Sequence, residues 1–430
     1  MSTKTTRRKF LKTAAVAAIG MPTIIPASAL GRDGIVAPSN RIVLGGIGLG
    51  PRGRKVLDAF FQHDDCQFIA IADPQAERSE IIKRLADRNY ENTDCVKYDD
   101  MSGVLERDDI DAVIIATGDR WHTTASILAA RAGKDIYCEK PCAMNIQECQ
   151  ELDDTIKKEG RVFQAGTQRR SVPNFQIAAD LAQSGKLGNL TEVHAGILEL
   201  QEYLEPLPAQ PEPDPAEINW DKWLGPSPWL DFNEEYCKRS RWRNHKGLYA
   251  AWRLPEWGSH TIDLCQWAAG ADGTTPVEFE AESDSLIHAK YANGIKLVMR
   301  LSSGKGVGDW IAGLGSCPVR YVGDEAWVEA GDYEGIESSN PKLLAGKTVE
   351  EISGTDPIHH ARNFLDCVKT REEPVCNSTA VRYGHMACFA AAISWKLGRK
   401  VTFDPETESF VGDDEANAMR TYERRAPYTI

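Results

Sequence analysis

The chain has 430 residues, 42% of them hydrophobic, and a formal net charge of −13. A chain of this length can bury a large core, and we expect two domains. The acidic balance, with no basic patch, argues against nucleic acid and anionic membranes as partners and favours a small neutral or cationic ligand.

The first 29 residues predict an export signal. Residues 1–12 carry five basic residues and no acid, and an uncharged run follows that is shorter than the roughly 20 apolar residues of a membrane span. The tripeptide ASA ending at residue 29 has the small residues of a cleavage site. Arg7 and Arg8 resemble the twin-arginine signal of proteins exported already folded. We therefore expect a periplasmic or otherwise exported protein that uses the twin-arginine machinery; an ordinary signal with incidental arginines is the alternative.

The chain without this segment carries 45 Lys and Arg against 63 Asp and Glu, a net charge of −18. Its eleven cysteines are scattered and include no CxxC pair, so they do not predict a disulfide framework. Folding before export would bury free thiols before they meet an oxidant. No later stretch is long and apolar enough for a membrane span, so we expect no stable membrane anchor.

The segment after the signal predicts a dinucleotide-binding fold. A short apolar strand over residues 41–47 leads into GLGPRG, where Gly48, Gly50 and Gly53 fit G-x-G-x-x-G. The first glycine permits a tight turn, the second lets the backbone approach a pyrophosphate, and the third lets the following helix pack on the strand. The amino terminus of that helix attracts the phosphates.

Further strands and helices alternate after this loop. A second strand over residues 66–74 contains Asp73, 25 residues after Gly48. An acid there accepts hydrogen bonds from the ribose hydroxyls and repels a 2′-phosphate, which favours NAD over NADP. A strand over 111–119, a helix and a strand over 135–141 follow, and this alternation predicts a parallel sheet.

The EKP motif at residues 139–141, after a helix that begins with His122, resembles the Gfo/Idh/MocA oxidoreductases. The stretches GTQRRS and WGSHTIDLCQW and the C-terminal tail extend the resemblance to the end of the chain. The family implies an α/β protein with an NAD-binding Rossmann domain over 40–166. It also implies a substrate-binding α/β domain over 167–430, with an open, mostly antiparallel sheet, and a homo-oligomer.

The resemblance also implies site residues. Lys140 would hold a substrate hydroxyl and steady the developing alkoxide, whereas the plain alternative is a surface lysine paired with Glu139. Arg169 would lie at the mouth of the substrate domain. The residues implied to bind the cofactor are Gly48, Gly50, Arg52, Gly53, Asp73, Thr117, His122, Glu139, Lys140 and Gln168.

A helix is predicted from near Pro255, and Glu256, His260 and Asp263 share one of its faces. An imidazole can take a hydroxyl proton near neutral pH. The resemblance implies a catalytic His260, and the alternative is a buried structural histidine. The family more often has Asp at the position of Glu256. The longer side chain of Glu256 either orients the site or itself performs acid–base work. Asp263 is a candidate substrate contact.

Seven of the eleven tryptophans lie between residues 220 and 267, around a proline-rich stretch. Their rings suit sugar binding, and they equally suit the anchoring of a long irregular segment. Trp242, Arg243 and Tyr249 are nearest the predicted helix and are candidate substrate contacts. Strands are predicted within 277–331 and helices over 359–370 and 378–398. No metal site is expected.

An exported protein cannot count on free NAD outside the cell, so we expect the cofactor to be loaded before export and held through many turnovers. The sequence thus favours an NAD-dependent oxidoreductase acting on a hydroxyl of a sugar or glycoside. One alternative is an NAD-dependent glycoside hydrolase, which oxidises a ring carbon, eliminates the aglycone and reduces the ring again. The other is a non-catalytic, cofactor-bound sugar-binding protein.

Overall fold

The computed structural model describes residues 37, 40–238, 241–302, 314–333, 335–347 and 353–430. Residues 1–41 and residues 42–430 form separate units, and the architecture below is that of the second unit. The predicted export signal, with Arg7 and Arg8, lies outside the described residues. No described helix has both the length and the apolar character needed to cross a bilayer.

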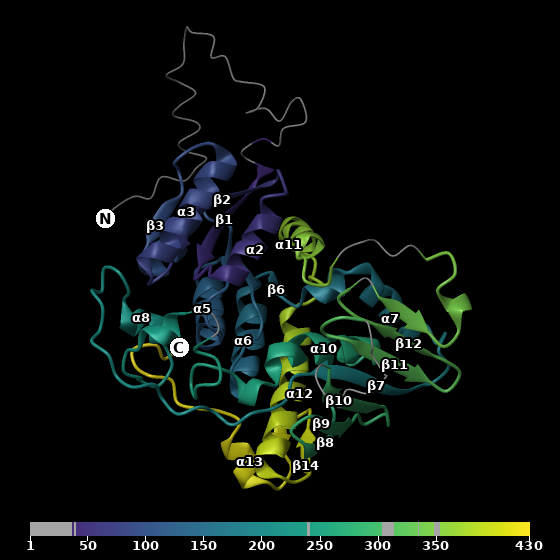
Figure 1. Cartoon of the computed structure of the whole chain (residues 1–430). Coiled ribbons are helices and arrows are strands. Elements are labelled where there is room, and N and C mark those ends of the chain that lie inside the picture. The colour runs from purple at the N-terminus through teal and green to yellow at the C-terminus, as the bar shows by residue number, and fades with distance from the viewer. Residues whose placement is uncertain (1–36, 38–39, 239–240, 303–313, 334, 348–352) are drawn as a thin grey trace. The chain divides into compact units, whose positions relative to one another are not determined.

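A six-stranded parallel sheet forms the N-terminal half of this unit. Its strands are β1 (Ile42–Ile47), β2 (Cys66–Ala72), β3 (Val96–Tyr98), β4 (Ala112–Ile115), β5 (Asp135–Cys138) and β6 (Phe163–Ala165). They pair in the order β3-β2-β1-β4-β5-β6, every pair parallel, which confirms the predicted Rossmann sheet. Figure 1 labels β1, β2, β3 and β6 of this sheet. The strand order reverses between β1 and β4, where such sheets bind ligands at their carboxyl edge.

Helices connect these strands because parallel neighbours need a crossover. They are α2 (Pro51–Phe60), α3 (Ala76–Tyr90), α4 (Ser102–Leu105), α5 (Asp119–Arg131) and α6 (Ile146–Glu159). Pro51 begins α2 at a position that suits proline, and α2 buries Val56, Leu57 and Phe60 against the sheet.

A second sheet of nine strands forms the C-terminal half. Its strands are β7 (Leu190–Ile197), β8 (Glu278–Ser283), β9 (Leu286–Lys290), β10 (Lys296–Leu301), β11 (Val319–Gly323), β12 (Trp327–Ala330), β13 (Ile336–Ser338), β14 (Val401–Asp404) and β15 (Ser409–Phe410). The order is β13-β12-β11-β7-β10-β9-β8-β14-β15, and of the described pairs only β7 with β10 is parallel. The prediction of an open, mostly antiparallel second sheet is confirmed. That the protein forms a homo-oligomer stays a prediction.

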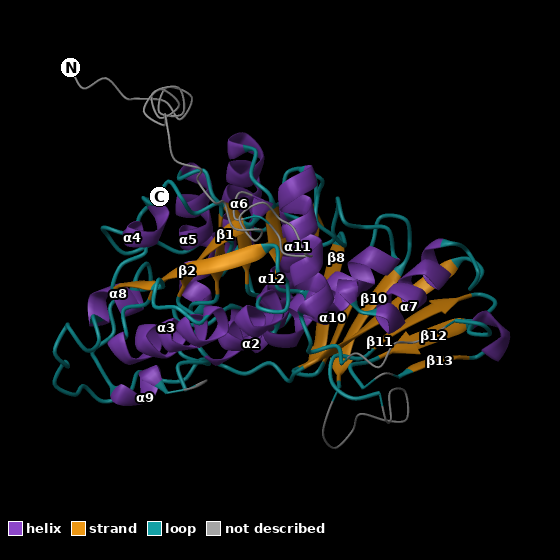
Figure 2. Ribbon diagram, turned by 90° about the horizontal axis from the view of Figure 1, so that it is seen from above, coloured by secondary structure: helices purple, strands orange, loops and turns teal. Residues whose placement is uncertain are grey.

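Helices α7 (Pro173–Gln183), α10 (Pro255–Ala268) and α12 (Ser378–Leu397) pack against this sheet, and Figure 2 shows α7 and α10 over it. The alanine-rich α12 contacts both α6 and α10, so it lies between the two halves of the unit. The predicted helices from Pro255 and over 378–398 are confirmed. The remaining C-terminal elements are the 3₁₀ helix at Pro341–Leu343 and α13 (Asp414–Ala418).

Helix α11 (Ile358–Thr370) comes from the second half of the chain but packs on α2 of the first. The ring of Phe364 lies 6.0 Å from those of Phe60 and Tyr137. Residues assigned by sequence to the second domain thus complete the core of the first, and the exact boundary at residue 166 stays a prediction.

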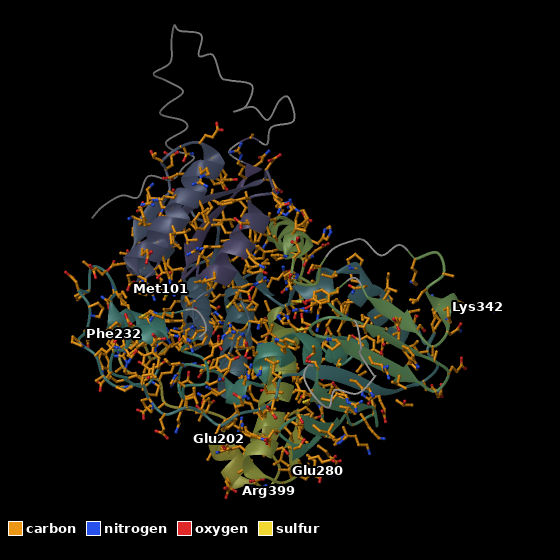
Figure 3. The ribbon with its side chains drawn as sticks, in the orientation of Figure 1. Met101, Glu202, Phe232, Glu280, Lys342 and Arg399 are labelled. Carbon is orange, nitrogen blue, oxygen red and sulfur yellow. The ribbon has the colours of Figure 1, made fainter. Side chains whose placement is uncertain are left out.

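An irregular segment with helices α8 (Trp220–Leu224) and α9 (Glu234–Cys237) has a small core of its own. Trp220 and Trp223 stack with ring centroids 4.6 Å apart, and Phe232, labelled in Figure 3, packs edge-on against Trp220 at 5.1 Å. Tryptophans therefore anchor this irregular segment, which is one of the two roles that their clustering in the sequence suggested.

Candidate active site

A cavity of about 330 Å³ lies at the carboxyl edge of the parallel sheet, where the strand order reverses. Its size is within the usual range for small-molecule sites. The predicted site residues that line it are Gly48, Gly50, Arg52, Asp73, Thr117, Trp242 and Arg243.

The glycine loop after β1 fits a dinucleotide. Gly48 has φ +65°, and a Cβ there would lie 2.3 Å from the Thr117 Cγ2 atom, so this position requires glycine. A Cβ at Gly50 would meet nothing nearer than Arg78 Nη1 at 3.6 Å. Packing within the protein therefore does not require glycine at position 50. The absent side chain leaves room for a phosphate to approach the backbone there. Gly53 lets α2 pack closely, since a Cβ there would lie 3.0 Å from its neighbours.

Asp73 follows β2 and lies in the cavity wall with 5% of its surface exposed. Its Oδ1 accepts a hydrogen bond from the Gln75 amide at 2.9 Å. Burial raises the pKa of Asp73 to about 6, and the charge of Arg78 opposes that shift. The carboxyl group is thus mostly ionised at neutral pH and is placed to accept hydrogen bonds from a ribose.

The EKP motif follows β5. Buried Glu139 accepts a hydrogen bond from Arg52 Nε at 2.8 Å, and a Cβ at Gly166 would lie 2.7 Å from its Oε1. The Lys140 ammonium instead crosses to α10 and donates to the Glu256 carbonyl oxygen at 2.5 Å. Burial, and next the charge of Arg243, lower the pKa of Lys140. Lys140 is therefore not the simple surface partner of Glu139.

The Glu256 carboxylate is held by three donors. Arg243 Nη1 lies 2.7 Å from Oε1, while the Tyr249 hydroxyl and Arg253 Nε lie 2.6 and 3.1 Å from Oε2. Burial alone would raise the pKa of Glu256, but Arg243 and the Tyr249 hydroxyl lower it. Glu256 stays ionised and fully bonded, so the geometry favours orientation of the site over acid–base work.

A strained turn leads into α10. Ala251, Trp252 and Arg253 have φ values of 35°, 47° and 80°, a left-handed region that costs non-glycine residues about 1–3 kcal/mol each. The Tyr203 hydroxyl accepts a hydrogen bond from the Trp252 amide at 3.3 Å. This turn brings Arg253 to Glu256.

His260 lies one helical turn after Glu256, whose main-chain carbonyl oxygen accepts the hydrogen bond from Lys140, and the charge of Lys140 acts on the imidazole. It is 5% exposed, and its Nδ1 has no hydrogen-bond partner among the described residues. Burial, and then the charges of Arg169, Lys140 and Arg52, hold the pKa of His260 well below its usual value. The imidazole is therefore neutral and able to accept a proton.

Arg169 belongs to the 3₁₀ helix η3 (Gln168–Ser171) and makes a buried bidentate pair with Asp332. Its Nε and Nη2 lie 2.7 and 2.6 Å from the two carboxylate oxygens, and Ser316 donates to the same carboxylate. Arg169 Nη1 is buried and has no partner within the described chain. As far as the described residues go, that donor is available to a ligand, and the predicted contact of Arg169 with the substrate stays a prediction.

Asp263 is bonded within the protein. Both of its oxygens accept hydrogen bonds from Arg170, at 2.8 and 2.7 Å, and Arg170 also pairs with Asp272. Asp263 lies two turns after Glu256 on α10, where its side chain contacts η3 and does not line the cavity. Asp263 therefore fastens α10 to η3, and its predicted contact with the substrate stays a prediction.

His122 and Gln168 support loops and do not line the cavity. His122 Nδ1 donates to the Pro141 carbonyl oxygen at 2.6 Å, and burial lowers its pKa to about 4. Gln168 Nε2 donates to the Gly354 carbonyl oxygen at 2.9 Å. Their predicted cofactor contacts stay predictions.

The sequence did not indicate four of the residues that line the cavity. They are Arg78, Arg120, Trp121 and Tyr428. The sequence signal available for two of them was GDRW, which begins α5 directly after β4, at the ligand edge of the sheet. Within the part of the chain that the structure describes, no three His, Cys, Asp or Glu residues are grouped to hold a metal ion, and all eleven cysteines are free.

Two protein-family models match the chain. One, described as an oxidoreductase family NAD-binding Rossmann fold, covers residues 41–167, and the other, its C-terminal alpha/beta domain, covers residues 203–430. A glycosyl hydrolase family 109 protein of Shewanella sp. (strain W3-18-1) is 31% identical over 169 residues. That match covers 35% of this chain and only 37% of the relative's own length.

Solved structures share the fold. The aldose-aldose oxidoreductase from Caulobacter crescentus superposes with a TM-score of 0.59 at 18% identity, over 84% of this chain and 100% of that one. The WlbA dehydrogenase from Chromobacterium violaceum, solved with NADH and UDP-GlcNAcA, superposes with a TM-score of 0.61 at 16% identity, over 86% and 98%. At these identities the likeness shows the fold alone.

Proposed function

Since the chain belongs to the Gfo/Idh/MocA oxidoreductase family and has its NAD(P)-binding Rossmann domain, we propose that it oxidises a hydroxyl group of a sugar or glycoside with a tightly held NAD. The observation that carries this proposal is the pair of His260 and Lys140. The charge of the half-buried Lys140 ammonium acts on the neutral imidazole of His260, and Glu256, which accepts from Lys140 through its carbonyl oxygen, is held by Arg243 of the cavity wall. Carbohydrate chemistry is supported by the names of the similar proteins.

The chain's own groups divide the work as follows. Lys140 holds the hydroxyl oxygen and stabilises negative charge as it develops. His260 takes the hydroxyl proton on its imidazole, and ionised Glu256 keeps Arg243 and Tyr249 in place. The nicotinamide, when bound, supplies the hydride acceptor. The loop of Gly48 and Gly50 and the carboxylate of Asp73 would hold the dinucleotide.

A redox-neutral glycosidase is the second candidate, favoured by the match to a glycosyl hydrolase family 109 protein. Elimination of an aglycone needs an acid for the leaving oxygen. Glu256 is poorly suited to supply it because its carboxylate is ionised and bonded to three donors. This contact set favours the oxidoreductase.

One assay separates these functions. Nicotinamide absorbance and aglycone release are followed together on a panel of aryl glycosides and free sugars. Reduced cofactor without aglycone is the expected result. Catalytic aglycone release without net reduction would replace the proposal by the glycosidase, and binding of sugars without either signal would leave a sugar-binding protein.

We also propose export of the folded, cofactor-loaded protein, on the basis of Arg7 and Arg8. Replacing both arginines by lysine should leave the precursor in the cytoplasm, because the folded-protein route reads the arginine pair. Immunoblots of fractionated cells measure the distribution, with Lys4→Arg as the control. Continued export of the double variant would contradict this route.

Asp73→Ala should reduce the preference for NAD over NADP, which we propose for the parent protein. Losing a charge-assisted hydrogen bond to the ribose, worth about 1.5–3 kcal/mol, should weaken NAD binding roughly 10- to 100-fold. NADP binding should change less, because the repulsion of its 2′-phosphate disappears. Calorimetric titration measures both, and exposed Asp64 near the other end of β2 provides the control variant Asp64→Ala. Equal NADP and NAD affinity in the parent would refute the role of Asp73.

A further inference from the structure

Arg120, in the first turn of α5, is a buried cation to which no carboxylate of the described residues is bonded. It is 3% exposed, and its guanidinium lies 3.8 Å from the ring centroid of Trp223. Its Nε and Nη2 donate to the Trp223 carbonyl oxygen at 3.0 and 2.5 Å, and Nε also lies 3.2 Å from the Leu224 carbonyl oxygen. Nη1 is buried, and the described residues supply no partner for it.

Arg78, on α3, is a second cation in the same cavity wall. Its Nη2 donates to the Cys237 carbonyl oxygen at 2.7 Å. Its Nη1 lies 3.6 Å from the place of a Cβ on Gly50, so it faces the glycine loop. The charge of Arg78 also acts on Arg120, and both residues line the same cavity.

A further anion would stabilise this arrangement. Burial lowers the pKa of Arg120 to about 9; the charge of neighbouring Asp119 opposes the shift and that of Arg78 adds to it. A desolvated cation beside a like charge is unfavourable, and a counter-charge in addition to that of Asp119 would stabilise it. Both arginines line the cavity, so the counter-charge can come from a ligand inside it.

The position of the pair indicates which part of a dinucleotide it meets. Arg120 Nη1 lies 2.2 Å from the place of a Cβ on Gly118, and the preceding residue, Thr117, contacts Gly48. The pair is therefore next to the glycine loop that receives phosphates. The charge of Arg78 also reaches Asp73, but a 2′-phosphate next to Asp73 would be repelled by its buried carboxylate.

We propose that Arg78 and Arg120 bind the pyrophosphate of the dinucleotide and thereby couple its occupancy to the docking of residues 219–237. The carbonyl groups that the two arginines hold all belong to that segment. The proposal rests on dinucleotide binding by the Rossmann domain and not on the oxidation of a sugar.

Other contacts of the same segment make it a cover of the cavity. The Trp121 indole donates to the Lys222 carbonyl oxygen at 2.9 Å, and the Asn219 amide donates to the Pro74 carbonyl oxygen at 3.0 Å. The C-terminal tail joins the cover, because the Tyr428 hydroxyl lies 2.6 Å from Asp221 Oδ2. Figure 1 shows α8 and the C-terminus together beside α5. An anion that holds both arginines would thus hold the cover closed.

Adenine nucleotides test the proposal without any sugar. The full chain, freed of bound nucleotide, is titrated calorimetrically with adenosine, AMP, ADP and adenosine 2′,5′-bisphosphate. Arg120→Met and Arg78→Met should each weaken ADP binding roughly 10- to 100-fold, as expected for loss of a charge-assisted bond, and leave adenosine binding unchanged. Arg84→Met, an exposed arginine on α3, is the matched control and should change neither.

Limited proteolysis measures the coupling. ADP should protect residues 219–237 of the parent and fail to protect them in the two variants. Unchanged ADP affinity in Arg120→Met and Arg78→Met would overturn the proposal, as would selective loss of the 2′,5′-bisphosphate or an equal loss for adenosine and ADP. If Arg120→Met does not fold, the half-buried Arg78→Met still decides the question.

Discussion

Replacing His260 by alanine should lower the rate of cofactor reduction by roughly 100- to 10,000-fold, the usual loss when a positioned acid–base group is removed. The bound nucleotide should be kept, because His260 does not line the cofactor cavity. Turnover should fall more than affinity for the sugar, since the proton moves only in the transition state. Single-turnover nicotinamide absorbance measures the loss. His288→Ala, on the exposed part of β9, is the control.

The pH profile gives a second measure of His260. The protonated imidazole cannot act as a base, so activity is lost as the pH falls through the pKa of His260. Burial and the charges of Arg169, Lys140 and Arg52 lower that pKa, so the acid limb of kcat/KM should lie below about 6.5, the usual histidine value. An acid limb at or above that value, or near-parental turnover in His260→Ala, would remove His260 from the mechanism.

Replacing Lys140 by methionine should lower turnover roughly 100- to 1,000-fold, comparable to removing a donor that stabilises an oxyanion. Methionine keeps most of the volume and removes the ammonium that now reaches the Glu256 carbonyl oxygen. Sugar affinity should fall as well, because the same ammonium holds the substrate hydroxyl. Steady-state rates and calorimetric nucleotide binding separate these effects, and Lys55→Met, exposed on α2, is the control.

The basic limb of the profile tests the charge of Lys140. Burial and the charge of Arg243 lower its pKa below 10.5, so the ammonium loses its proton, and activity falls, at a lower pH than for an exposed lysine. Lys140→Arg keeps the charge but not the compact geometry and should move the limb to higher pH at reduced turnover. Parental rates in Lys140→Met would show that another group holds the alkoxide.

The sequence by itself determined the Rossmann sheet, the glycine loop, the place of Asp73 and the helix that carries Glu256 and His260. Each depends on local rules: a φ of +65° at Gly48, the alternation of strand and helix, and the spacing that places residues i and i+4 on one helix face. Residues near one another in the chain settle these features, so a single sequence shows them.

Tertiary structure alone decided which polar groups are partners. Asp332, which holds Arg169, is 163 residues away from it, and the carbonyl of Trp223 that Arg120 binds is 103 residues away. For Asp263, too, the sequence predicted the face of α10 on which it lies but did not predict its ion-pair partner, Arg170. A buried charge needs a hydrogen-bond or ion-pair partner within about 3 Å, and tertiary packing decides which group that is. The periodicity of the sequence does not predict this partner.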